Sequence, residues 1–265
     1  MKYEVFTVEK DPGTRVATLW HDNAERRNAM GPAFWKELPL VMEELANDRE
    51  VRAVVLAGRG RDFSVGLDLK TMMGTLEGGR EALLEQILRL QRSISSVADC
   101  PKPVVAAVHG YCLGGGVDLA TACDIRYASA DAVFSIRETR MAMVADVGTL
   151  QRLPAIVGKG FVAELALTGD DIPASRAKEI HLVNEVFPDA ESTLAAARSL
   201  AARIARNSPR AVTGTKRVLQ FCEGKSVADG LRYVAVWNAA FLPSKDLEEA
   251  VRAFLEKREP EFTGE

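Results

Sequence analysis

The sequence is poor in cysteine and histidine. Its cysteines form no CxxC pair; they are Cys100, Cys112, Cys123 and Cys222. A chain of 265 residues can bury a core without covalent cross-links. We therefore expect reduced thiols and a reducing compartment. The three histidines lie far apart in the sequence, so a zinc site built from these residue types is not expected.

Long apolar runs and a targeting pattern are also missing. Residues 1–6 do not combine a basic segment with an apolar one. The longest apolar stretches are far shorter than the roughly 20 residues of a membrane-spanning helix. The net charge is −3, and lysine and arginine are spread along the chain, unlike the basic stripe of a nucleic-acid-binding protein. We expect a soluble, cytoplasmic protein with no membrane or nucleic-acid partner.

Strand-like and helix-like segments alternate through the first part of the chain. Apolar runs and period-two patterns predict strands at residues 3–9, 15–20, 51–57, 103–108 and 125–128. Apolar residues at helical spacing predict helices at residues 32–45, 81–97 and 117–123. This alternation predicts an α/β fold built from units with right-handed crossovers.

The character of the sequence changes after about residue 190. Four helical patterns follow with no convincing strand between them: residues 191–206, 209–221, 227–241 and 246–257. We therefore predict a core with the functional site in residues 1–190 and a helical region in residues 191–265. The helical region is too small for a confident core of its own, and we expect it to cover the main core or a neighbouring subunit.

Two glycine-containing turns follow buried strands. The first leads through Gly114, Gly115 and Gly116 into a helix, and the second, at residues 63–70, contains Gly66. Backbone N–H groups at such turns can bind a phosphate or a developing oxyanion. No Walker A or G-x-G-x-x-G spacing is present. From the residues alone, a close strand-to-helix crossing and an ordinary turn remain open readings.

Three carboxylic acids follow the first glycine turn in apolar surroundings: Asp118, Glu138 and Asp146. Apolar surroundings raise the pKa of a carboxyl group, which suits proton transfer near neutral pH. Any one of them could be structural, but the three together favour catalysis. His109, just before the turn, is expected to be a hydrogen-bonded histidine at a strand end.

Longer segments of the chain resemble the crotonase (enoyl-CoA hydratase/isomerase) family. Residues 104–119, VVAAVHGYCLGGGVDL, resemble its signature around one oxyanion-hole donor, and residues 63–69, FSVGLDL, resemble the other. Residues 25–30, ERRNAM, resemble the early segment that contacts coenzyme A. The similarity extends from about residue 5 to 260.

This resemblance implies a crotonase-like spiral of ββα units with a C-terminal helical trimerisation region. It implies a homotrimer or a homohexamer, arranged as a dimer of trimers. The N–H groups of Leu67 and Gly115 would hold the thioester oxygen of an acyl-CoA. No metal and no cofactor would be needed, since coenzyme A is part of the substrate. Substrate or CoA contacts are expected from Arg26, Arg27, Val65, Asp68, Leu69 and Lys70.

The acids indicate the branch of the family. Hydratases resemble this chain at Asp118 and Glu138 but carry two glutamates there, and they usually have glycine at the position of Asp146. Residues 145–153 and 233–238 resemble the Δ3,5-Δ2,4-dienoyl-CoA isomerases. That resemblance implies conversion of 3,5-dienoyl-CoA to 2,4-dienoyl-CoA in fatty-acid beta-oxidation.

In this hypothesis Glu138 serves C2 and Asp146 serves C6, with the reverse assignment open, and Asp118 orients Glu138 or shapes its pKa. One alternative is an enoyl-CoA hydratase, in which Asp146 has no role. Another is a non-catalytic crotonase-like scaffold or an RNA-binding protein. The three acids, both glycine loops and the acidic net charge disfavour this second alternative.

Overall fold

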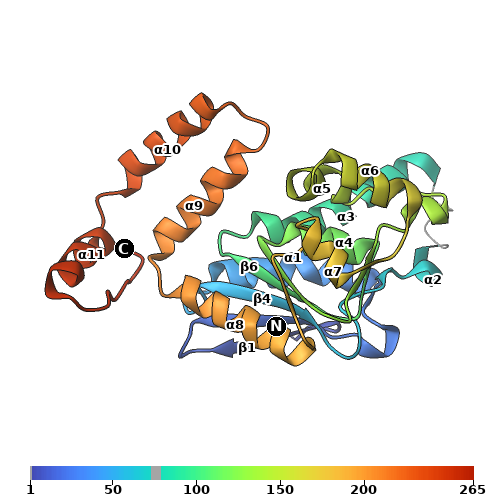
Figure 1. Cartoon of the computed structure of the whole chain (residues 1–265), viewed down its shortest axis with the longest axis horizontal. Coiled ribbons are helices and arrows are strands. Elements are labelled where there is room, and N and C mark those ends of the chain that lie inside the picture. The colour runs from blue at the N-terminus through green and yellow to red at the C-terminus, as the bar shows by residue number, and fades with distance from the viewer. Residues whose placement is uncertain (1, 73–78) are drawn as a thin grey trace.

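The computed structural model describes residues 2–72 and 79–265 (Figure 1). Its largest sheet has six strands in the order β1-β2-β4-β6-β8-β11. These strands are β1 (Phe6–Asp11), β2 (Val16–His21), β4 (Ala53–Gly58), β6 (Val104–Val108), β8 (Ile125–Ser129) and β11 (Glu185–Phe187). β1 pairs antiparallel with β2, and every later pairing in this sheet is parallel.

Short strands form a second layer beside the large sheet. They are β3 (Ala29–Met30), β5 (Gly66–Leu67), β7 (Tyr111–Leu113), β9 (Val133–Ser135) and β10 (Ile172–Pro173). β3 pairs in parallel with β5 and β7 with β9, and a parallel bridge joins Ser64 to Cys112. β2, β4, β6 and β8 are thus each followed by a short strand, and these short strands lie beside one another from turn to turn. The predicted spiral of ββα units is confirmed.

Helices complete the turns of this spiral. They are α1 (Pro32–Asn47), α2 (Leu69–Met72), α3 (Gly79–Asp99), α4 (Gly115–Ala122), α5 (Thr149–Val157), α6 (Lys159–Thr168) and α7 (Ala174–Glu179), with 3₁₀ turns η1 (Ala24–Arg26) and η3 (Glu138–Met141). Pro39 lies within α1, which continues through it. None of the helices in the described part of the chain is long and apolar enough to cross a membrane.

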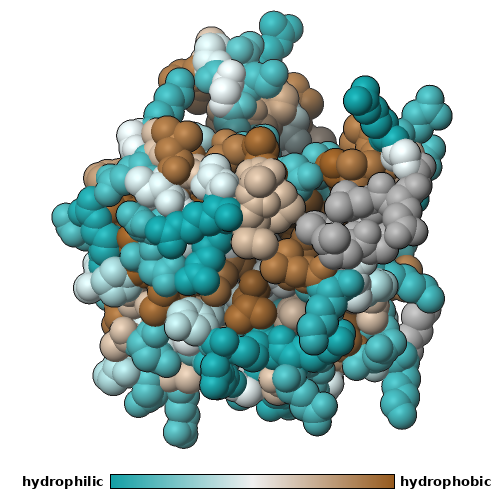
Figure 2. All heavy atoms as spheres, turned by 90° about the vertical axis from the view of Figure 1, so that its right-hand side faces the viewer, coloured by the Kyte–Doolittle hydropathy of each residue, from teal (hydrophilic) through white to brown (hydrophobic). Residues whose placement is uncertain are grey.

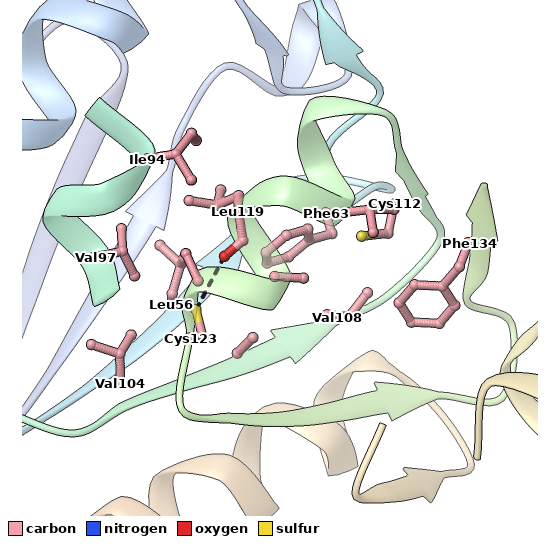
Figure 3. Packing of buried hydrophobic residues seen from close by; sticks show 14 of the residues in the cluster. Leu56, Phe63, Ile94, Val97, Val104, Val108, Cys112, Leu119, Cys123 and Phe134 are labelled. Atoms are coloured by element: carbon pink, nitrogen blue, oxygen red, sulfur yellow. Dashed lines mark hydrogen bonds between the residues drawn. The ribbon is translucent and has the colours of Figure 1, made fainter. Parts of the chain in front are cut away.

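Both faces of the large sheet are covered, which explains its continuous apolar strands. Val54 and Leu56 of β4 belong to the main core cluster, whereas Val55 belongs to a second cluster on the other face. Figure 3 shows Ile94 and Val97 of α3 near Leu119 of α4 in the main cluster. The core therefore holds the start of α4, and the glycine turn before it, in a fixed position against the sheet.

The C-terminal helices divide between the core and a projection. They are α8 (Ala190–Ala205), α9 (Pro209–Cys222), α10 (Val227–Phe241) and α11 (Lys245–Glu256). α8 packs on the sheet through Ala197, Ala201 and Ala205. The other three form what we call the C-terminal arm, which extends away from the core in Figure 1. The helical region predicted from residue 191 thus supplies one helix to the core and three to the arm.

Candidate active site

The two glycine turns meet side by side at the start of α4. Ser64 joins them: its N–H donates to Tyr111 O over 2.9 Å, and its carbonyl accepts from Leu113 N over 3.0 Å. Gly66 has φ +83°, and a Cβ there would lie 2.5 Å from Leu113 O. Only glycine allows this approach, because a side chain at residue 66 would meet backbone rather than a movable group.

Two backbone donors point into the space between these turns. The N–H of Asp68 donates to Met30 O of β3, so the preceding N–H, that of Leu67, points away from β3. Gly115 opens α4, where N–H groups have no acceptor within the helix. A Cβ at Gly115 would lie 3.7 Å from Leu67 N, which places the two donors next to each other. This arrangement can hold one developing oxyanion.

Glu138 lies beside this pair of donors. Its Oε1 would be 3.2 Å from a Cβ on Gly114, the residue that precedes Gly115. Its Oε2 is buried and has no partner among the described residues. Burial, and then the negative charge of Asp118, raise the pKa of Glu138 to about 7. A carboxyl group with that pKa can both accept and release a proton near neutral pH.

Asp118 is fully buried on α4, behind Glu138. Its Oδ1 accepts a 2.5 Å hydrogen bond from the backbone N–H of Thr149, at the start of α5. Its Oδ2 finds no partner in the described structure. Burial raises the pKa of Asp118 to about 6, although the hydrogen bond from Thr149 stabilises the carboxylate and lowers the pKa. Asp118 acts on Glu138 through its charge, which favours the protonated form of the glutamate.

Asp146 lies in the irregular segment between η3 and α5, and is open to solvent on one side. Partial burial raises the pKa of its carboxyl group above the ordinary value of 3.8. Its charge in turn contributes to the raised pKa values of Glu138 and Asp118. The structure therefore brings the three predicted acids within electrostatic reach of one another.

The residues expected to contact coenzyme A come together at the entrance to the glycine turns. Arg26 donates to Asp68 over 2.8 Å, and its side chain is 57% exposed. Leu69 and Lys70 are exposed on α2, and Val65 is half-buried. Arg27 is placed differently. It makes bonds of 2.7 and 3.2 Å to the buried Asp62 and lies over the Tyr111 ring, 4.7 Å from its centroid.

Other predictions about this region can be placed on the structure. His109 is bonded through Nε2 to Gly60 O over 2.9 Å, so the expectation of a hydrogen-bonded histidine is confirmed. Within residues 2–72 and 79–265, no group of three or more metal-ligating side chains could hold an ion. A cavity of about 1150 Å³ opens between the core and the arm, lined partly by Lys216 and Trp237, but it includes none of the three acids.

The sequence did not indicate the residues that hold the Asp146 segment. Gln91 Nε2 donates to the carbonyl of Asp146 over 2.7 Å. Arg152 donates to Val147 O over 3.3 Å and to Ser95 Oγ over 2.9 Å. The only signal for Gln91 was its polar side chain at a position in the helical apolar pattern of residues 84–94.

Known proteins resemble this chain over nearly its whole length. It is 43% identical to the mitochondrial Delta(3,5)-Delta(2,4)-dienoyl-CoA isomerase of Dictyostelium discoideum, over 98% of this chain and 92% of that protein. It is 43% identical to the peroxisomal enzyme of the same name from Arabidopsis thaliana, over 96% and 95% of the two chains. The crystal structure of an enoyl-CoA hydratase from Bacillus anthracis superposes with a TM-score of 0.92 at 31% identity, covering 99% and 100%.

These relatives correct one prediction. We expected a cytoplasmic protein because residues 1–6 show no targeting pattern. The names of the relatives place them in mitochondria or peroxisomes, so the prediction of a cytoplasmic protein is wrong. The first residues were a poor guide because a missing pattern there carries little information about where an enzyme works.

The profile of the family described as Enoyl-CoA hydratase/isomerase matches residues 13–265. That range contains both glycine turns, all three acids and the C-terminal arm. The fold, the paired backbone donors and the profile agree, and the chain belongs to the enoyl-CoA hydratase/isomerase family.

Proposed function

We propose that this protein is a dienoyl-CoA isomerase of fatty-acid beta-oxidation, which converts 3,5-dienoyl-CoA to 2,4-dienoyl-CoA. The observation that carries the proposal is a second acid, Asp146, held near Glu138 at one oxyanion hole. Relatives that bear this activity in their names match 96% or more of the chain at 43% identity. The overall reaction moves two double bonds and one proton, with no group gained or lost.

The chain's own groups can perform each step. A carboxylate removes a proton from C2, and the electron pair moves into a dienolate whose charge reaches the thioester oxygen. The N–H groups of Leu67 and Gly115 hold that oxygen. A protonated carboxyl group then delivers a proton to C6. Two acids are needed, because one short side chain cannot reach both carbons. We assign Glu138 to C2, because it stands at the position of a catalytic glutamate of the hydratases, and Asp146 to C6; the reverse assignment is the alternative.

Asp118 supports the chemistry without touching the substrate. It is fully buried, and its charge contributes to the raised pKa of Glu138. Its bond to Thr149 also ties α4 to the segment that carries Asp146, three residues earlier in the chain. Asp118 is therefore a positioning residue for both proton-transfer groups.

The surroundings suit the two ends of an acyl-CoA. The exposed cations Arg26 and Lys70 suit the phosphate groups of coenzyme A. On the other side, Leu84 and Leu88 of α3 are exposed and share a helix face with Gln91, next to Asp146. Apolar side chains gather on this side of the molecule in Figure 2. They suit the acyl tail beyond C6.

We also propose that the arm assembles the protein into a trimer or a hexamer. The arm leaves large apolar side chains exposed, among them Phe254 at 82% and Leu255 at 73%. Such a surface on a projecting element suits an interface between copies. Light scattering of Phe254→Glu should show smaller species than the unchanged protein. An unchanged mass for Phe254→Glu, or a monomeric starting protein, would contradict this assembly.

The activity is tested with purified protein and a 3,5-dienoyl-CoA. The expected result is growth of the ultraviolet absorbance of a conjugated 2,4-dienoyl thioester. Glu138→Gln should reduce the rate about 10²- to 10⁴-fold, the usual range for loss of a general acid or base. Absence of the dienoyl signal with rapid hydration of 2-enoyl-CoA would replace the proposal with a hydratase. Absence of both would favour a non-catalytic protein.

A further inference from the structure

Asp146 has no regular secondary structure to fix its position. It lies between Met141, the last residue of η3, and Thr149, the first residue of α5, in a segment with no helix or strand. Two backbone bonds hold the start of this segment, from Ala142 N to Thr139 O at 3.3 Å and from Met143 N to Glu138 O at 2.9 Å. A proton donor must be placed closely against its carbon, so side chains from elsewhere have to hold the rest.

α3 supplies those side chains from a single face. Gln91 and Ser95 are four residues apart, and therefore lie one above the other on the helix. Gln91 donates directly to the carbonyl of Asp146, whereas Ser95 accepts from Arg152, which donates to the carbonyl of Val147. Two consecutive carbonyl groups of the segment are thus bonded to α3, one directly and one through a guanidinium group.

The contact with Arg152 is close as well as polar. Gly148 has φ +129°, and a Cβ there would lie 1.7 Å from Arg152 Nη1. Arg152 also lies near enough to Asp118 to stabilise its charge. The guanidinium group therefore packs against the chain where it turns from Asp146 into α5. Neither Gln91 nor Arg152 is hydrogen-bonded to the Asp146 carboxyl group in the described part of the chain, so these residues leave that group available to a substrate.

We propose that Gln91 is a positioning residue that fixes Asp146 for proton transfer at one end of the dienoyl system, with Ser95 and Arg152 holding the adjacent carbonyl. This inference rests on the proposed function and adds a specific role for α3. Glu138 is placed independently, against Gly114, and has no bond to Gln91. Loss of the Gln91 bond should therefore impair one proton transfer and spare the other.

The test separates the two ends of the substrate by isotope exchange. The protein is incubated in D₂O with 3,5-dienoyl-CoA, to measure deuterium at C2 of recovered substrate. It is incubated separately with 2,4-dienoyl-CoA, to measure deuterium at C6 of that recovered compound, so each carbon is measured without prior reaction at the other. Asp146→Asn first identifies the carbon that Asp146 serves. Gln91→Met, which keeps the side-chain length but cannot donate, should slow deuterium transfer at that same carbon about tenfold, the effect of losing about 1.4 kcal/mol. Exchange at the other carbon and KM should change less than about twofold.

A matched control has the same kind of bond elsewhere on α3. Gln220 Nε2 of α9 donates over 2.7 Å to the carbonyl oxygen of Ala98, near the end of α3 and seven residues after Gln91. Gln220→Met should leave the ratio of exchange at the two carbons unchanged. Equal loss at both carbons in Gln91→Met, or no loss, would overturn the role of Gln91. Wild-type protein that forms no 2,4-dienoyl-CoA from 3,5-dienoyl-CoA would instead overturn the proposed function.

Discussion

The backbone N–H of Thr149 donates a 2.5 Å hydrogen bond to Oδ1 of Asp118, although Asp118 is fully buried on another helix. A carboxyl group thus lies at the first residue of α5, where an anion is stabilised by unpaired N–H groups. Its second oxygen has no partner among the described residues. The bond orders the site, but the buried charge costs stability.

Asp118→Asn should therefore stabilise the protein above pH 6 and have little effect at low pH. The folded pKa, about 6, exceeds the ordinary value of 3.8, so the folded state binds this proton more tightly. Protonated Asp118 is tolerated in the folded state, so the folded protein has its full stability below pH 4. This stability decreases as the pH rises through 6 and Asp118 ionises. Asparagine keeps an oxygen for Thr149 and carries no charge.

Denaturant unfolding of both proteins at pH 4 and pH 8 measures this effect. The variant-minus-wild-type difference in unfolding free energy should rise by about 3 kcal/mol between the two pH values, at about 1.4 kcal/mol per pKa unit. Groups that do not interact with Asp118 cancel in this difference, and removal of the repulsion between Asp118 and Glu138 adds to it in the same direction. A difference independent of pH would show that Asp118 is not held as a buried acid.

Gly114→Ala should lower kcat without unfolding the protein. Gly114 has φ +50°, and a Cβ there would lie 3.2 Å from Glu138 Oε1. The added methyl group must shift the carboxyl group that accepts a proton by a few tenths of an ångström. A misplacement of about 1 Å can cost about 10²-fold in rate, so we expect a smaller loss than that. Gly224→Ala is the control, since Gly224 also has a positive φ, +67°, but a Cβ there meets nothing within 4 Å. Equal kcat values in the two variants would refute the contact.

The rate of isomerisation should follow a bell-shaped pH profile. One acid of the pair must be ionised and the other protonated at the start of each turnover. The pKa of Glu138 is raised to about 7, chiefly by burial, and that of Asp146 is raised above 3.8 by partial burial. Activity should therefore fall below the lower of these two pKa values, as both acids become protonated. It should fall above about 7, as both become ionised. A profile flat from pH 5 to 9 would contradict paired proton transfer.

Arg26 and Arg27 should have different roles despite being neighbours in the sequence. Arg27→Met removes the closer of two cations from the buried Asp62, which keeps Arg61 at 3.2 Å, and we expect a loss of about 2 kcal/mol in unfolding free energy. Arg26→Met removes an exposed cation from the entrance and should raise KM for acyl-CoA with little change in stability. Thermal unfolding and initial rates of both variants check this. A similar effect of both variants on KM would contradict the assignment.

The sequence predicted the long elements well, because periodicity needs length. The buried strand at 104–108 and the helix at 79–99 were expected within two residues of their observed ends. β3 and β5, of two residues each, were missed because so short a segment has no measurable period. They matter, since the pairing of β3 with β5 turns the N–H of Leu67 toward Gly115.

The sequence predicted the catalytic acids from their apolar surroundings. It did not predict the side chains that hold those acids in position. Asp118 and Glu138 are followed or preceded by apolar residues, a local signal that the sequence carries directly. Gln91 acts on Asp146 from 55 positions away through a backbone carbonyl, which any residue could offer. Contacts of that kind depend on how α3 crosses the segment between η3 and α5, and no local pattern encodes that crossing.

The most direct test compares Asp146→Asn with wild-type protein on two substrates in parallel. On 3,5-dienoyl-CoA, formation of the conjugated 2,4-dienoyl thioester should fall about 10²- to 10⁴-fold. On 2-enoyl-CoA, any hydration by the wild type should persist in the variant, since Asp146 has no role in it. Full isomerase activity in Asp146→Asn, or rapid hydration by a wild type that forms no dienoyl product, would contradict the account.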